Sequence, residues 1–178
     1  MKKERKSKKA PKKRERTINI TVYLVLRFLV ILCMVEQALK GNWHSVALCF
    51  LTLALFTIPT IVSKNFNVKL PTTLEIIVYL FIFGAEILGE IQNFYGIFSH
   101  WDTMLHTLNG FLAAAVGFSL IDILNRTERF HIKMTPIFVA LVAFCFSMTI
   151  GVLWEFGEFA MDQYARLDMQ KDRIVQDI

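Results

Sequence analysis

Five apolar segments, each about 20 residues long, make up most of this chain of 178 residues. An α-helix needs about 20 residues to cross a hydrocarbon core of about 30 Å, and its backbone polar groups are then all satisfied internally. We therefore expect an all-α fold, a polytopic membrane bundle of about five transmembrane helices. The expected spans cover residues 18–39, 44–62, 73–93, 103–125 and 136–161.

The basic residues are distributed very unevenly along the chain. Ten of its twenty Lys and Arg lie in the first sixteen residues. Short loops rich in Lys and Arg stay in the cytoplasm, and with the N-terminus inside, fifteen of the twenty lie on that side. Residues 1–17 are therefore expected to be a disordered, basic, cytoplasmic tail, and residues 18–162 the transmembrane helical domain. Residues 163–178 are expected to be an extracytoplasmic C-terminal segment.

The expected partners follow from the same distribution of charge and hydrophobicity. The apolar segments require a lipid bilayer, and the basic tail is expected to contact anionic lipid head groups. Such a tail could also bind nucleic acid, but orienting the chain and binding the membrane surface is the more usual role, so no nucleic acid is expected. Nothing in the sequence indicates the oligomeric state. Cys33, Cys49 and Cys145 lie within apolar segments, where buried, reduced thiols are expected.

Polar side chains recur at helical spacing on the last three expected helices, near the end that would face outward. Residues spaced at i, i+3 or i+4, and i+7 lie on one face of an α-helix. The three polar stripes are Glu86, Glu90 and Asn93; Asp102, His106 and Asn109; and Glu155, Glu158 and Asp162. Ionisable residues inside a membrane are costly and usually functional. We therefore expect the stripes to converge in one outward-facing pocket, with Asp162 at its mouth.

Carboxylates packed this closely cannot all ionise unless they share protons or a cation neutralises them. Carboxylate and imidazole groups on neighbouring helices form metal sites in helical bundles, and oxygen-rich sites suit Mg²⁺, Mn²⁺, Zn²⁺ or Ca²⁺. A divalent metal cation is therefore the expected cofactor. The expected metal ligands are Glu86, Glu90, Asp102, His106, Glu155 and Glu158. The bland alternative is that Asp102 caps its helix and that Asp162 is solvated.

Two of these stripes carry a resemblance to a known family. The stretches "HWDTMLH" and "WEFGEF" resemble signatures of the YjdF-like bacterial inner-membrane proteins, a family of unknown function, and "FGAEILGEIQNFYGI" and "LDMQKD" are similar to its Gram-positive branch. The similarity to VanZ-like proteins is weaker. The resemblance implies a multi-pass protein of the bacterial cytoplasmic membrane. YjdF-like proteins usually continue into another apolar helix, so the chain is expected to be a truncated relative or a fragment.

Three classes of function remain open. The first is a metal-dependent extracytoplasmic enzyme acting on an envelope or lipid-linked substrate, with Asp102, His106, Glu155 and Glu158 as the catalytic residues. Asp102 and His106 would be the base and its orienter, and the Glu residues would hold the metal or act as general acid. The second is a proton- or cation-coupled transporter, which is disfavoured because the stripes lie on one side only. The third is a non-catalytic structural or regulatory membrane factor.

Overall fold

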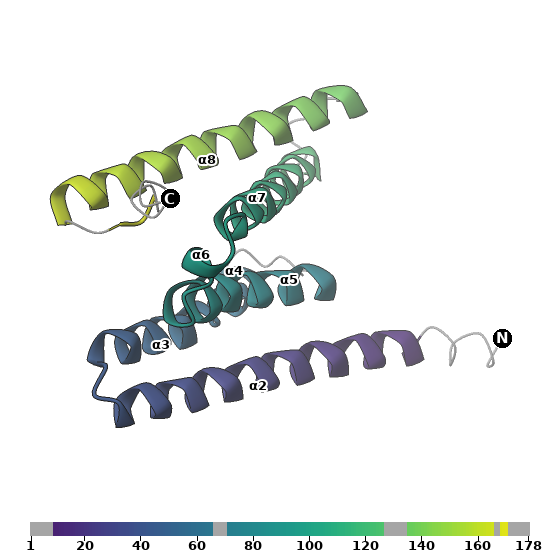
Figure 1. The fold of residues 1–178 in the computed structure, drawn as a ribbon. Coiled ribbons are helices and arrows are strands. Elements are labelled where there is room, and N and C mark those ends of the chain that lie inside the picture. Colours follow the sequence, from purple (N-terminus) through teal and green to yellow (C-terminus); the bar gives the residue numbers. More distant parts are fainter. Residues whose placement is uncertain (1–8, 66–70, 127–134, 166–167, 171–178) are drawn as a thin grey trace. The chain divides into compact units, whose positions relative to one another are not determined.

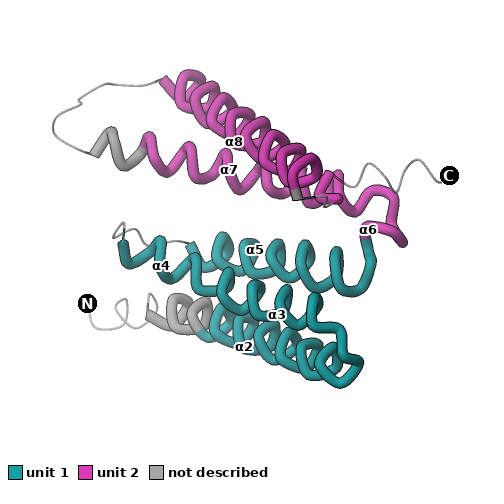
Figure 2. The backbone as a smooth tube through the Cα atoms, turned by 90° about the vertical axis from the view of Figure 1, so that its left-hand side faces the viewer, with its two compact units in different colours: residues 1–94 teal, residues 95–178 magenta. Residues whose placement is uncertain are grey.

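The computed structural model describes residues 9–65, 71–126, 135–165 and 168–170, and every regular element among them is helical (Figure 1). Within these described residues, four helical segments are long and apolar enough to cross a membrane, which confirms the all-α polytopic fold. The elements in chain order are α2 (Lys9–Leu39), α3 (Trp43–Leu55), α4 (Ile58–Asn65), α5 (Thr72–Ile82), η1 (Phe83–Ile91), α6 (Phe94–Ile97), α7 (Trp101–Arg126) and α8 (Pro136–Ala165). The chain forms two compact units, residues 1–94 and 95–178 (Figure 2).

The four candidate spans agree closely with four of the five expected ones. They are Thr17–Leu39, Trp43–Asn65, Trp101–Ile121 and Pro136–Tyr164. The remaining expected span, residues 73–93, corresponds to α5 and η1, which are 11 and 9 residues long and follow each other without a break. This continuous helical segment is not among the candidate spans, so the fifth span remains a prediction.

The first helix begins earlier than the sequence suggests. The tail is expected to be disordered to residue 17, but α2 begins at Lys9 and runs for 31 residues. Lys, Arg and Glu are good helix formers. Pro11 lies in the first turn, where a backbone N–H has no partner within the helix, so the ring is tolerated there. Residues 1–8 of the expected tail lie outside the described residues.

The first unit packs α2, α3, α5 and η1 around one apolar core. The rings of Tyr23, Phe56 and Tyr79 meet there, with centroids 5.3 to 6.3 Å apart. Helix α3 ends at Leu55 and α4 begins at Ile58, so the helix is interrupted just before Pro59. This interruption follows from the proline, which has no N–H to continue the hydrogen-bond pattern. The buried thiols Cys33 and Cys49 belong to the same core, as expected.

The second unit is an antiparallel hairpin of α7 and α8 (Figure 2). Small residues let the two backbones approach, as is common between membrane helices. Ser147 Oγ donates to the carbonyl oxygen of Gly110 across the interface at 2.7 Å. A Cβ added at Gly117 would lie 3.1 Å from the side chain of Phe146. Cys145, by contrast, is exposed, contrary to expectation, because it lies on a side of α8 that α7 does not cover.

The contact at Gly117 leads to a test of this packing. We expect Gly117→Leu to lower the stability of the detergent-purified protein by about 1–3 kcal/mol, because the new side chain would collide with Phe146. Gly151→Leu is the matched control, since a Cβ added at Gly151 meets nothing within 4 Å. Thermal unfolding followed by circular dichroism measures both variants. Equal midpoints for the two variants would contradict close packing of α7 on α8 at this position.

Candidate metal centre

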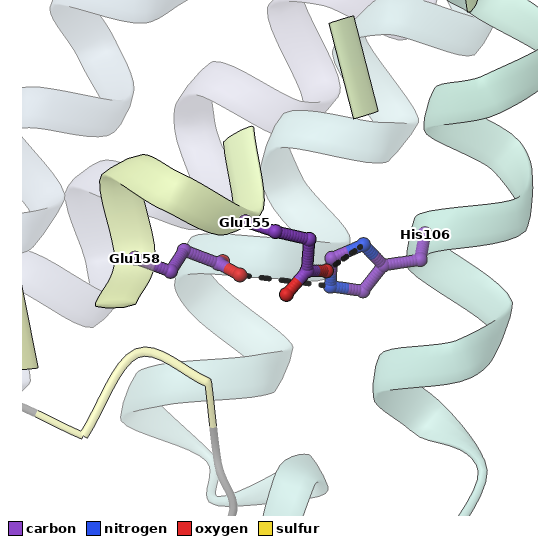
Figure 3. Close-up of side chains that lie close together, drawn as sticks. All are labelled: His106, Glu155 and Glu158. Atoms are coloured by element: carbon purple, nitrogen blue, oxygen red, sulfur yellow. Dashed lines mark ion pairs between the residues drawn. The ribbon is translucent and has the colours of Figure 1, made fainter. Parts of the chain in front are cut away.

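The centre of this site is the imidazole of His106, which lies among three carboxylates at one end of the hairpin. Figure 3 shows two of these carboxylates, Glu155 and Glu158, beside the imidazole. Its Nε2 is 3.5 Å from Asp102 Oδ1, one turn earlier on α7. Its Nδ1 is 3.6 Å from Glu155 Oε1, and its Nε2 is 4.0 Å from Glu158 Oε2, both on α8. The i, i+4 spacing on α7 and the i, i+3 spacing on α8 therefore bring four of the expected site residues together.

The spacing of these groups suits a metal ion. His106, Glu155 and Glu158 each offer one ligand atom, and the three atoms lie within 4.8 Å of one another. Donors bound to one ion at about 2.0–2.2 Å lie about 3.4 Å apart in a tetrahedral site, so small side-chain movements would close the set. If one imidazole nitrogen bound an ion, the other could keep a carboxylate partner, as metal-bound histidines usually do.

Glu158 is the most informative member of the cluster, because it is buried and only half satisfied. Its residue is 7% exposed. Oε1 accepts a hydrogen bond from Trp154 Nε1 at 2.7 Å, one turn earlier on α8. Oε2 is buried and has no hydrogen-bond partner among the described residues. A buried carboxylate charge without compensation costs several kcal/mol of folding free energy, and a bound cation or a proton on this oxygen would remove that cost.

Glu155 and Asp102 occupy more open positions beside Glu158. The side chain of Glu155 is 50% exposed, and its Oε2 accepts a hydrogen bond from Gln170 Nε2 at 3.4 Å. Asp102 lies in the first turn of α7, which begins at Trp101, so it does not cap the helix from outside. Its negative charge there is favoured by the helix dipole. A cavity of about 490 Å³ opens between these groups, lined by Asp102, Thr103, His106, Glu155, Glu158 and Gln170.

The stripe expected from Glu86, Glu90 and Asn93 differs from the prediction. Glu86 and Glu90 lie on η1, a π-helix, whose hydrogen bonds join residues five apart, as Gln92 N to Ile87 O does at 3.0 Å. Asn93 follows the helix end at a φ of 57°, a left-handed conformation that Asn adopts more readily than most residues. The three residues therefore do not form one α-helical stripe. Glu86 and Glu90 belong to the first unit, and their participation in the centre remains a prediction.

Three further residues differ from the sequence-based expectation. Asp162, expected at the mouth of the pocket, accepts hydrogen bonds from the backbone of Met169 and Gln170. Gln170 itself was not predicted, although it lines the cavity and contacts Glu155. Helical periodicity gives no signal for it because it lies beyond the end of α8. Asn109 is half-buried on α7 and does not line this cavity.

Comparison with known proteins places this chain. Residues 18–177 match the family described as predicted membrane protein (DUF2238). The chain belongs to this family. A relative of this DUF2238 protein in Thermotoga maritima, described as an uncharacterized protein, is 27% identical over 105 residues. The match covers 59% of the chain and 52% of the relative, so the chain spans about half the length of that protein. No solved structure matches. Membership of DUF2238 is compatible with the resemblance to YjdF-like proteins, and the similarity to VanZ-like proteins stays a prediction.

Proposed function

We propose that this DUF2238 protein binds a divalent metal ion at the end of the α7–α8 hairpin through His106, Glu155 and Glu158. The observation that carries the proposal is the buried Oε2 of Glu158, which has no hydrogen-bond partner among the described residues and lies 4.0 Å from His106 Nε2. One imidazole with carboxylates favours Mn²⁺ or Zn²⁺, because Ca²⁺ usually takes six to eight oxygen ligands. By the distribution of Lys and Arg, the site faces the outside of a bacterial cytoplasmic membrane.

The proposed role of the metal is catalytic. Three protein ligands leave coordination positions open, which is typical of catalytic rather than structural zinc sites. The cavity beside them has room for a reacting group of a substrate. A bound ion supplies Lewis acidity there, and Asp102, 3.5 Å from His106 Nε2, orients the ring or accepts a proton. Because the site lies at the end of a membrane hairpin, an envelope or lipid-linked molecule is the proposed substrate.

A non-catalytic role is the second candidate, and a specific contact favours it. His106 on α7 approaches both Glu155 and Glu158 on α8, so the cluster also joins the two helices. Such a tie would stabilise the hairpin without any reaction. The two roles differ in their dependence on metal, because a tie made by a protonated imidazole needs none.

Metal content of the purified protein tests the proposal. We expect about one equivalent of Mn²⁺ or Zn²⁺ per chain by inductively coupled plasma mass spectrometry, and loss of this metal in Glu158→Gln and in His106→Ala. Glu36→Gln is the matched control, because Glu36 is an exposed carboxylate on α2 that pairs with Lys40. Wild-type protein that neither retains a metal nor takes one up on titration would contradict the proposed function.

A further inference from the structure

Residues 168–170, which follow α8 in the sequence, are held by one carboxylate of that helix. The backbone N–H of Met169 donates to Asp162 Oδ1 at 2.6 Å, and that of Gln170 donates to Asp162 Oδ2 at 3.0 Å. Both oxygens of Asp162 thus hold two consecutive amides. Hydrogen bonds to an ionised acceptor are roughly twice as strong as neutral ones. Asp162 is therefore an anchor for the described residues 168–170.

This anchor determines where the side chain of Gln170 lies. Gln170 Nε2 donates to Glu155 Oε2 at 3.4 Å, while the other oxygen of the same carboxylate is 3.6 Å from His106 Nδ1. The amide therefore occupies one oxygen of Glu155 and leaves the other facing the imidazole. A half-exposed Glu held only at its backbone would sample several rotamers, and ordering it when a metal binds would cost conformational entropy.

We propose that Gln170 is a positioning residue for Glu155, and that Asp162 makes it one by anchoring residues 168–170. Gln170 also forms part of the cavity wall, so a residue beyond the end of α8 belongs to the site. The effect on metal binding rests on the proposed function, whereas the anchoring by Asp162 does not. Removing a group that orients a metal ligand typically weakens metal binding 10- to 100-fold.

Two measurements on the full chain in detergent test the proposal. Hydrogen–deuterium exchange of the metal-free protein measures the anchor, and we expect slow exchange of the Met169 and Gln170 amides that Asp162→Asn makes fast. Mn²⁺ titration measures positioning, and we expect Gln170→Ala and Asp162→Asn each to weaken binding about 10-fold. The double variant should bind no more weakly than either single one, because both changes break the same connection. Gln163→Ala, an exposed glutamine on α8, is the control and should bind as wild type.

Each outcome has a definite meaning. Fast exchange of these amides in the wild-type protein would overturn the anchor. Wild-type Mn²⁺ affinity in Gln170→Ala, or losses that add in the double variant, would overturn positioning through Gln170. A midpoint of thermal unfolding that stays unchanged in metal-free Gln170→Ala would support a local role over a structural one. If the wild type bound neither Mn²⁺ nor Zn²⁺, the proposed function and the positioning role would both be refuted, and the exchange measurement would still decide the anchor.

Discussion

Saturating Mn²⁺ or Zn²⁺ is expected to raise the midpoint of thermal unfolding of this protein by about 5–11 °C. A ligand that binds only the folded state adds about 2.7 kcal/mol at 100 times its dissociation constant, and about 2–4 °C per kcal/mol applies to a chain of this size. The physical source of the gain is the cluster of His106, Glu155 and Glu158. Without a cation, the carboxylates of Glu155 and Glu158 repel each other. A chelator should reverse the shift.

The control for this experiment is a variant that keeps the fold but loses the ligands. In Glu155→Gln with Glu158→Gln the shift should vanish, whereas in Glu36→Gln it should persist, because Glu36 lies on α2 and pairs with Lys40. A midpoint of thermal unfolding that no divalent ion changes, but that rises on acidification, would contradict the metal centre and indicate shared protons instead.

Glu158→Gln is expected to abolish function while making the metal-free protein more stable. The Gln side chain has nearly the same shape, and its carbonyl oxygen can still accept the hydrogen bond from Trp154. It carries no charge, so the buried position that Oε2 occupies no longer imposes the cost of an unpaired carboxylate. We expect a gain of about 1 kcal/mol or more in the free energy of unfolding without metal, and metal affinity lower by at least about 100-fold.

Two assays separate the two effects in Glu158→Gln. Complementation of a deletion strain measures function, and chemical or thermal unfolding of chelated protein measures stability. Glu155→Gln should also abolish function, but it should change the stability of the metal-free protein little, because the Glu155 side chain is 50% exposed. A Glu158→Gln protein that complements as wild type would identify the cluster as structural. A Glu158→Gln protein less stable without metal would show that the carboxylate is satisfied in the folded state.

The sequence predicts those parts of this fold that depend on hydropathy and helical period. Four candidate spans lie close to the expected ones because an apolar run of about 20 residues has the length of a helix that crosses the bilayer. Three carboxylates lie near His106 for two reasons. Asp102 is one turn from His106 on α7, and Glu155 and Glu158 are one turn apart on the facing helix α8. Both inferences need only local spacing and the rule that short connections join neighbouring helices.

The features that the sequence does not predict depend on backbone geometry. Nothing in the apolar pattern distinguishes the π-helix η1 from an α-helix, so the stripe of Glu86, Glu90 and Asn93 is assigned the wrong period. Gln170 contacts Glu155, and the backbone amides of Met169 and Gln170 donate to Asp162, although residues 168–170 lie beyond the end of α8. These residues lie beyond the helical segment, so helical spacing gives no information about them.

The hydrogen bond between Trp154 and Glu158 has an optical consequence. The indole Nε1–H donates to a carboxylate whose surrounding electrostatic field would change on binding a cation or a proton. The emission of an indole depends on the electrostatic field along its ring, so Trp154, which contacts Glu158, is an intrinsic fluorescent probe of the candidate site. The other two tryptophans, Trp43 and Trp101, can be replaced by Phe to leave its signal alone. Binding could then be followed in real time, in the unlabelled protein, by fluorescence.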